Sequence, residues 1–130
     1  MINERIQALA RDLSRVAPRS ARAPLGPYRV IAARAVDKCR AELAGRAGSY
    51  HYNCPLDREF FDFTGISAAE FKQFVATGAS DEEIVGWIAE KSRVHDSRKV
   101  ARWGQWFQLN PLSWLLDFDD WLHVRRNASL

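Results

Sequence analysis

Signals for the beginning and end of helices recur along this sequence and constrain its fold more than any other feature. Ser67 and Ser80 each precede a glutamate by three residues, which is the spacing of a capping box at a helix N-terminus. Asn3 and Asp96 also stand where a side chain can cap a helix. Glycines mark the expected helix ends at Gly45, Gly65 and Gly78. Signals at this density predict many short helices.

Apolar residues fall at helical spacing between these signals. Ala32, Val36, Cys39 and Leu43 share one face of an expected helix that begins near Pro27, where a missing N–H has no helical partner to lose. No stretch alternates apolar and polar residues between turn signals, so strands are not expected. The sequence therefore predicts an all-α fold, a compact single-domain bundle of about six to seven short helices with an irregular central loop.

Length and composition fit one globular domain. The 130 residues are expected to form a single helical unit, with 47% apolar and 27% charged residues. No stretch approaches the ~20 apolar residues that a membrane span requires, and the N-terminus lacks the layout of a secretory signal. With only two cysteines, these features favour a cytoplasmic protein without membrane contact. A disulfide between Cys39 and Cys54 is the alternative.

The central loop, residues 50–57, concentrates reactive side chains between two helical patterns. His51 and Cys54 could act as base and nucleophile, because a thiolate forms near neutral pH when a cationic or proton-accepting group lies beside it. Asn53 or Asp57 could then orient the imidazole. Packing of the cysteine and histidine is the alternative, and Asp57 also stands where it can cap the next helix.

A second group of candidate residues lies in the proline-containing connection before the helix expected near Pro27. The N–H groups at that helix N-terminus favour an anion, and Arg19 and Arg22 lie close enough in sequence to add charge-assisted bonds. Alternatively, Arg19 pairs with an acid in residues 51–96 and fixes the connection in place. The predicted ligand-binding residues for a small anionic ligand are these two arginines with Tyr50, Asn53 and Asp57.

Charge is unevenly distributed, although the net charge is only +3. Residues 1–50 carry a net charge of +6 and residues 51–96 carry −5. We interpret this as two segments that attract each other or line opposite solvated faces, with a basic patch that receives an anion as the alternative. The basic residues are dispersed rather than gathered on one helix, so specific nucleic-acid binding is not expected.

No metal or cofactor motif is present. His51 and Cys54 supply only two ligands, whereas a zinc site needs about four. The glycines of residues 45–49 lack the spacing and the lysine of a phosphate loop. We therefore expect neither a metal site nor a bound cofactor.

The C-terminal part is rich in tryptophan. All five tryptophans lie between Trp87 and Trp121. The helices expected in residues 97–124 carry too many large apolar side chains for one face, including Trp103 and Trp106. We expect another helix or a second copy of the chain to cover part of this surface, which predicts a homo-oligomer as one outcome.

Several motifs together resemble a family of small bacterial proteins known as domain of unknown function 5069. The resemblance extends over roughly residues 12–90, and its most specific part is residues 50–57. Ala21 and Pro27 depart from the family pattern, which has proline and glycine there. The resemblance implies a compact, mostly helical bacterial domain and brings no activity. The supporting motifs are Pro18-Arg19-Ser20, Leu25-Gly26, Asp37-Lys38, Leu43-Ala44-Gly45, Tyr50-His51-Tyr52-Asn53-Cys54-Pro55-Leu56-Asp57, Phe63-x-Gly65-Ile66 and Thr77-Gly78-Ala79-Ser80-Asp81-Glu82-Glu83.

Three functional hypotheses follow. The first is a cytoplasmic helical binding domain whose small-molecule or anion site is formed by residues 50–57 and 19–22. The second is a cysteine-dependent enzyme that uses Cys54 and His51. The third is an interaction protein that dimerises through its C-terminal helices. The sequence does not decide among them, and it indicates no substrate or pathway.

Overall fold

The computed structural model describes residues 3–109 of the chain. More than half of the described residues are helical, and the one β-type pairing in this range is an isolated bridge between Leu25 and Tyr28. The prediction of an all-α fold is therefore confirmed. The helices are α1 (Glu4–Leu9), α2 (Ala32–Leu43), α3 (Pro55–Thr64), α4 (Ala68–Val75), α5 (Asp81–Lys91) and α6 (Ser97–Gln108).

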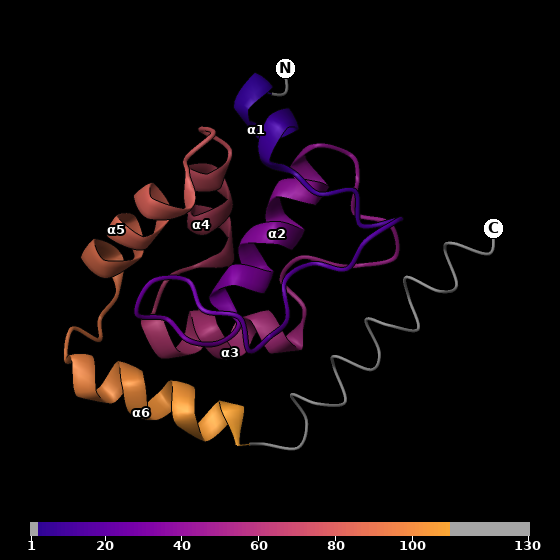
Figure 1. The fold of residues 1–130 in the computed structure, drawn as a ribbon. Coiled ribbons are helices and arrows are strands. Elements are labelled where there is room, and N and C mark those ends of the chain that lie inside the picture. Colours follow the sequence, from indigo (N-terminus) through magenta and orange to yellow (C-terminus); the bar gives the residue numbers. More distant parts are fainter. Residues whose placement is uncertain (1–2, 110–130) are drawn as a thin grey trace.

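Helix α2 lies at the centre of the fold (Figure 1). It contacts α1, α3 and α4, with α1 near one end and α3 crossing near the other. Helix α5 packs on α4 through a stacked pair of rings, Phe74 and Trp87, whose centroids are 5.0 Å apart. The apolar core joins α2 to Phe60 of α3, Phe71 of α4 and Ile84 of α5, all fully buried. Helix α2 is thus surrounded by the rest of the domain.

The structure corrects the expected start of α2. The helix begins at Ala32 and not near Pro27. Leu25 and Tyr28 exchange both backbone hydrogen bonds, at 2.7 and 3.0 Å, so the two residues between them form the tip of a tight turn. Gly26 has a φ of +56°, a left-handed conformation that glycine adopts without a steric penalty. The proline therefore belongs to a turn and not to the first turn of a helix.

The cap of α3 also differs from the one expected. Cys54 occupies the N-cap position, Pro55 follows at the start of the helix, and Asp57 lies within the first turn. The carboxylate of Asp57 accepts a hydrogen bond from the backbone N–H of Asn53 at 2.9 Å. Asn53 has a φ of +62°, which asparagine tolerates better than most residues. Asp57 therefore holds the loop against the helix without being its N-cap.

The other helix starts agree with the sequence signals. The side chains of Asn3 and Asp96 each accept a backbone N–H of the helix that follows them. Ser80 and Glu83 form a complete capping box at α5. Ser67 accepts a backbone N–H of α4, which is the first half of the box that the sequence indicated. Local capping chemistry was thus visible before any tertiary contact was known.

Helix α2 is buried on all sides, whereas the spacing of its apolar residues predicted one inward face. Its four central charged residues are all at most 5% exposed: Arg34, Asp37, Lys38 and Arg40. An ionised side chain in an apolar interior is costly unless it is paired and hydrogen-bonded. Each of these groups therefore requires partners from elsewhere in the chain, and two of them organise the candidate site.

The end of α6 leaves apolar side chains exposed. Trp103 stacks on Phe63 of α3 with ring centroids 4.5 Å apart. Trp106 is 61% exposed and Leu109 is 83% exposed. The last expected helix, which includes Trp114 and Trp121, lies outside the described residues. Oligomerisation through the C-terminal part therefore stays a prediction.

Candidate functional site

Adjacent residues of α2, Asp37 and Lys38, each gather a group of polar side chains. We call the first group, formed by Arg19, Asp37, Arg40 and Asp81, the Asp37 cluster. We call the second group, formed by Lys38, Cys54 and Asp57, the Lys38 cluster. Successive residues of an α-helix point about 100° apart, so the two clusters use different neighbours.

In the Asp37 cluster, Arg19 binds two carboxylates at once. Its backbone N–H and Nε donate to one oxygen of Asp37 at 2.7 and 3.1 Å, and its Nη2 donates to the other oxygen at 3.0 Å. Its Nη1 donates to Asp81 at 2.9 Å. Arg40 donates to the second oxygen of Asp81 and to the carbonyl of Ala79, each at 2.9 Å. The cluster therefore joins the connection before α2, α2 itself and the N-terminus of α5.

These contacts keep Asp81 and Arg19 ionised. Burial raises the pKa of Asp81, but the hydrogen bond and charge of Arg19, together with Arg40, outweigh it and leave the pKa below its ordinary 3.8. Burial lowers the pKa of Arg19, and Asp37 and Asp81 outweigh that effect. A guanidinium suits this position because its planar fork can serve two carboxylates.

The structure thus contains the alternative considered for Arg19, in which it pairs with an acid and fixes the connection before α2 in place. Arg19 pairs with Asp81, an acid within residues 51–96, and additionally with Asp37. The structure places no helix N-terminus at Pro27, so the geometry on which the predicted anion site relied is absent there. Arg22 is half-buried, and its backbone N–H donates to Ser20 Oγ at 3.1 Å. The charge of Arg19 is already balanced without a ligand.

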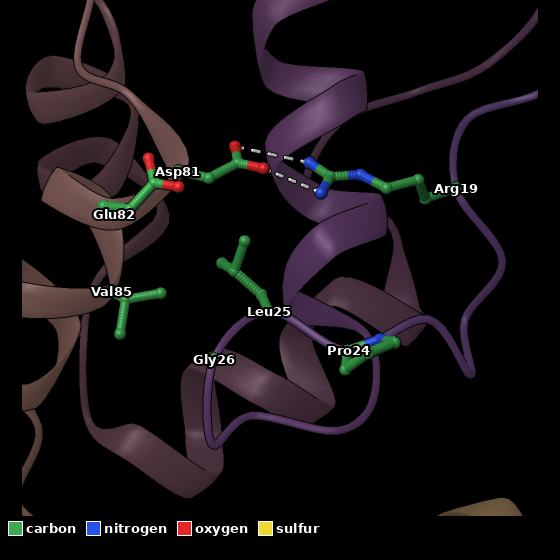
Figure 2. A pocket seen from close by; sticks show the side chains of 7 residues that line it. All are labelled: Arg19, Pro24, Leu25, Gly26, Asp81, Glu82 and Val85. Atoms are coloured by element: carbon green, nitrogen blue, oxygen red, sulfur yellow. Dashed lines mark hydrogen bonds and ion pairs between the residues drawn. The ribbon is translucent and has the colours of Figure 1, made fainter.

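A pocket of about 370 Å³ lies beside the Asp37 cluster (Figure 2). In Figure 2 the side chain of Leu25 lies between Val85 and the ion pair of Arg19 with Asp81, so apolar and charged side chains both line the pocket. Glu82 is exposed, and its carboxylate makes no hydrogen bond or ion pair with the residues that the structure describes. The lining residues are Arg19, Pro24, Leu25, Gly26, Asp81, Glu82 and Val85.

In the Lys38 cluster, one ammonium group holds both a carboxylate and a thiol. Lys38 Nζ lies 2.9 Å from Asp57 Oδ2 and donates to Cys54 Sγ at 3.1 Å. Lys38 is 3% exposed and Asp57 is 0% exposed, so both charges are withdrawn from water. Asp57 Oδ1 is buried without a hydrogen-bond partner. Cys54 is half-buried and is the one member that solvent reaches.

The remaining candidate residues of the central loop are divided between core and surface. Tyr50 is buried, with the guanidinium carbon of Arg34 5.6 Å from its ring centroid. Asn53 is half-buried and supports the turn before α3. His51 is exposed and makes no described hydrogen bond with Cys54. Residues 50–57 do not line the pocket beside Arg19, so the two halves of the predicted ligand site are not brought together in it.

Neighbouring residues hold the loop in place. The hydroxyl of Tyr52 donates to the carbonyl of Ala68 at 2.7 Å, and its ring packs against Phe61 and Phe71. Burial raises the pKa of Tyr52, which keeps the hydroxyl protonated as a donor. Tyr52 therefore holds this part of the loop against α3 and α4.

Sequence reasoning missed Lys38 as the neighbour of Cys54. The partner of Cys54 was expected within the loop, because a lysine on a helix is normally solvated. A signal was nevertheless present, because Asp37 and Lys38 interrupt a helix whose other residues include many small and apolar ones. A charged pair at the centre of such a helix indicates buried partners.

The other cysteine differs from Cys54. Cys39 is fully buried in the core, with 0% of its surface exposed to solvent. Burial raises the pKa of its thiol to about 12. Both cysteines are free, so the alternative of a disulfide between them is not formed. Cys39 is therefore an inert packing residue.

The sequence profile of one family matches residues 15–116, well over half of the chain. That family is described as domain of unknown function (DUF5069). The chain belongs to the DUF5069 family. This confirms the resemblance found from the motifs, and the matched segment of the DUF5069 domain extends beyond residue 90 through α6. No curated protein matches the sequence.

Two further observations concern residues 3–109 of this DUF5069 protein. Within that range, no three side chains among His, Cys, Asp and Glu lie close enough to hold one metal ion. None of the helices there combines the length and the apolar character needed to cross a membrane.

Proposed function

We propose that this DUF5069 domain binds a small organic cation with an apolar body. The observation that carries the proposal is the pocket of about 370 Å³ between residues 24–26 and α5. Small-molecule sites have volumes of roughly 300–1,000 Å³ and combine an apolar interior with a few fixed polar groups. The pocket lies within this range of volume, and it combines apolar side chains with the ion pair of Arg19 and Asp81.

The walls of the pocket are held in place before any ligand enters. The ion pair between Arg19 and Asp81 is tied to α2 through Asp37 and Arg40. The turn opposite is closed by two backbone hydrogen bonds, and Leu25 within it is only 3% exposed. Preformed walls favour binding because little conformational freedom is lost when the ligand is bound.

The charges at the rim favour a cation over an anion. Arg19 and Arg40 are balanced by Asp37 and Asp81, whereas Glu82 has no partner among the described residues. An amine beside Glu82 would gain a charge-assisted hydrogen bond. A carboxylate would have to displace Asp81 from Arg19. The small anion considered from the sequence is therefore the competing outcome of the test.

Matched ligands of opposite charge provide that test. Isopentylamine and isovalerate share a branched apolar body, and each can be titrated into the ¹⁵N-labelled full chain. We expect the amine to shift the amide signals of Gly26, Glu82 and Val85, and the carboxylate to leave them in place. Glu82→Gln should weaken amine binding by roughly two- to fivefold, as expected for an exposed ion pair.

A matched control separates the pocket from general surface charge. Glu90→Gln makes the same charge change at an exposed position on the same helix, outside the pocket, and should leave amine binding unchanged. Preferential binding of the carboxylate would overturn the cation assignment. The absence of signal shifts with both ligands at millimolar concentration would overturn the proposal of a binding site.

We also propose that the domain is cytoplasmic and that it associates with itself. The free thiols of Cys39 and Cys54 support a reducing compartment. The exposed Trp106 and Leu109 support an apolar contact near the end of α6. Sedimentation of the full chain at several concentrations tests the association, and a monomer at all of them would contradict it.

A further inference from the structure

We propose that oxidation of Cys54 leads to a covalent bond between its sulfur and Nζ of Lys38, a sulfenamide link between the central loop and α2. This inference does not depend on the proposed ligand pocket. It rests on the geometry of the Lys38 cluster, in which the thiol of a half-buried cysteine, a buried amine and a buried carboxylate are held in contact.

The reacting atoms are already placed against each other. Cys54 Sγ lies 3.1 Å from Lys38 Nζ. The lysine is 3% exposed and paired with Asp57, so its side chain is fixed and cannot turn to solvent. Cys54 is the half-buried member of the cluster, so a small oxidant would have to approach the cluster through this residue. Proximity of this kind converts a reaction between two side chains into a unimolecular step.

The first step is the oxidation of the thiol by a hydroperoxide. The sulfur of Cys54 loses two electrons and takes one oxygen atom as the O–O bond breaks, and the rest of the hydroperoxide leaves as an alcohol, or as water from hydrogen peroxide. The product is a sulfenic acid, the first and reversible stage of cysteine oxidation.

The second step is a condensation without further oxidation. The ammonium of Lys38 passes one proton to Asp57, whose Oδ2 lies 2.9 Å away and whose Oδ1 is buried without a partner. The neutral amine then attacks the sulfur, an S–N bond forms, and the S–O bond breaks. The hydroxyl group leaves with a proton from the nitrogen as water. Asp57 ends protonated, so no uncompensated charge is left in the core.

The other groups near Cys54 that could condense with its sulfenic acid are either absent, hydrogen-bonded or buried. Sulfenic acids condense with a thiol or with a backbone nitrogen. The residue after Cys54 is Pro55, which has no N–H to react. The backbone N–H of Asn53 is already bonded to Asp57. The other thiol, Cys39, is fully buried. Lys38 is thus the nitrogen that the fold presents to this sulfur.

Mass spectrometry of the folded, full-length Cys39→Ser variant tests the proposal. The variant excludes a disulfide within the chain, which has the same mass change. After treatment with hydrogen peroxide, we expect the intact protein to lose the mass of two hydrogen atoms. Digestion should then yield a cross-linked peptide pair that contains Lys38 and Cys54. Dithiothreitol should reverse the change.

Two further variants in the Cys39→Ser background serve as controls. Cys54→Ser should show no loss of hydrogen. Lys38→Arg keeps a positive charge but offers a poor nucleophile, and it should gain oxygen at Cys54 instead, provided that circular dichroism shows it to be folded. If Lys38→Arg does not fold, the proposal is still tested by whether the Cys39→Ser protein yields the cross-linked peptide pair.

Three results would overturn the proposal. The first is oxygen gain at Cys54 with Lys38 left unmodified in the folded Cys39→Ser protein. The second is a loss of two hydrogens that maps to another nitrogen. The third is reaction of Cys54 only after unfolding, which would show that the thiol is not accessible.

Discussion

The Asp37 and Lys38 clusters begin at adjacent residues of α2 but stabilise buried charge in different ways. In the Asp37 cluster, two arginines and two carboxylates share their contacts, and the side chains of Arg19 and Asp81 are 22% and 36% exposed. In the Lys38 cluster, one ammonium faces one carboxylate, and their side chains are 3% and 0% exposed. The charged groups of the first cluster have several partners and access to water, whereas Lys38 and Asp57 each face one opposite charge and have almost no access to water.

This difference determines what the loss of one member does. In the Asp37 cluster, a carboxylate that loses one arginine keeps another cation, because Asp81 contacts both Arg19 and Arg40 and Arg11 lies 3.7 Å from Asp37. In the Lys38 cluster, removal of the lysine leaves Asp57 buried without a cation. Breaking a buried pair in this way is far more costly than the pair's net contribution to stability.

The largest effect is expected for Lys38→Met. The change keeps the apolar stem and removes the ammonium, so we expect a loss of about 3–5 kcal/mol in the free energy of unfolding, measured by urea denaturation. The double variant with Asp57→Leu removes both charges and should be more stable than Lys38→Met alone. A loss below about 1 kcal/mol for Lys38→Met would show that the pair is not a buried one.

A smaller effect is expected for Arg19→Lys. A compact ammonium cannot donate to both oxygens of Asp37 and to Asp81 at once, so we expect a loss of about 1–3 kcal/mol in the free energy of unfolding. Arg58→Lys, at an exposed position of α3, is the matched control and should change stability by less than about 0.5 kcal/mol. Equal losses in the two variants would contradict the bridging role of Arg19.

The smallest effect is the dependence on pH that Asp81 contributes. Its pKa is lower in the folded protein than its ordinary 3.8, so the unfolded chain takes up the proton first as the pH falls. The stabilisation is therefore complete above the ordinary value and is lost as the pH falls through the folded value. We expect about 1 kcal/mol or less, because the side chain is partly exposed.

Asp81→Asn makes this contribution measurable. The difference in unfolding free energy between the wild type and the variant should shrink as the pH is lowered from 6 to about 3. Asp62→Asn, an exposed carboxylate on α3 without a described side-chain bond, is the control. A difference that stays constant over this range would mean that Asp81 is not held ionised by its arginines.

Helix content and most helix starts followed from local chemistry. A capping side chain such as Asn3, Ser80 or Asp96 acts on backbone groups within a few residues, so its effect is visible in the sequence. Two starts were mistaken because proline and aspartate serve turns as well as helices. At Pro27, the left-handed conformation of the neighbouring Gly26 and the backbone hydrogen bonds between Leu25 and Tyr28 form a turn instead of a helix start.

Local sequence signals identified only part of the candidate site. Cys54 and Asp57 were identified from the unusual loop, and a pairing of Arg19 with an acid from residues 51–96 was one of the alternatives. The partner of that pairing, Asp81, lies 62 residues away, and nothing local selects it from the other acids. His51 was chosen over Lys38 because the histidine is near Cys54 in sequence.

Tertiary packing alone decided which of these groups meet. Short-range signals specify backbone conformation, since capping and helical periodicity operate over one or two turns. The burial of α2 on every side depends on α1, α3, α4 and the connecting segments together. Once the helix is enclosed, Asp37 and Lys38 must find partners in whatever segments surround it, because a buried charge without a partner is unstable. The sequence thus specifies the helices, whereas the enclosure of α2 specifies the pocket beside Arg19 and the contact between Lys38 and Cys54.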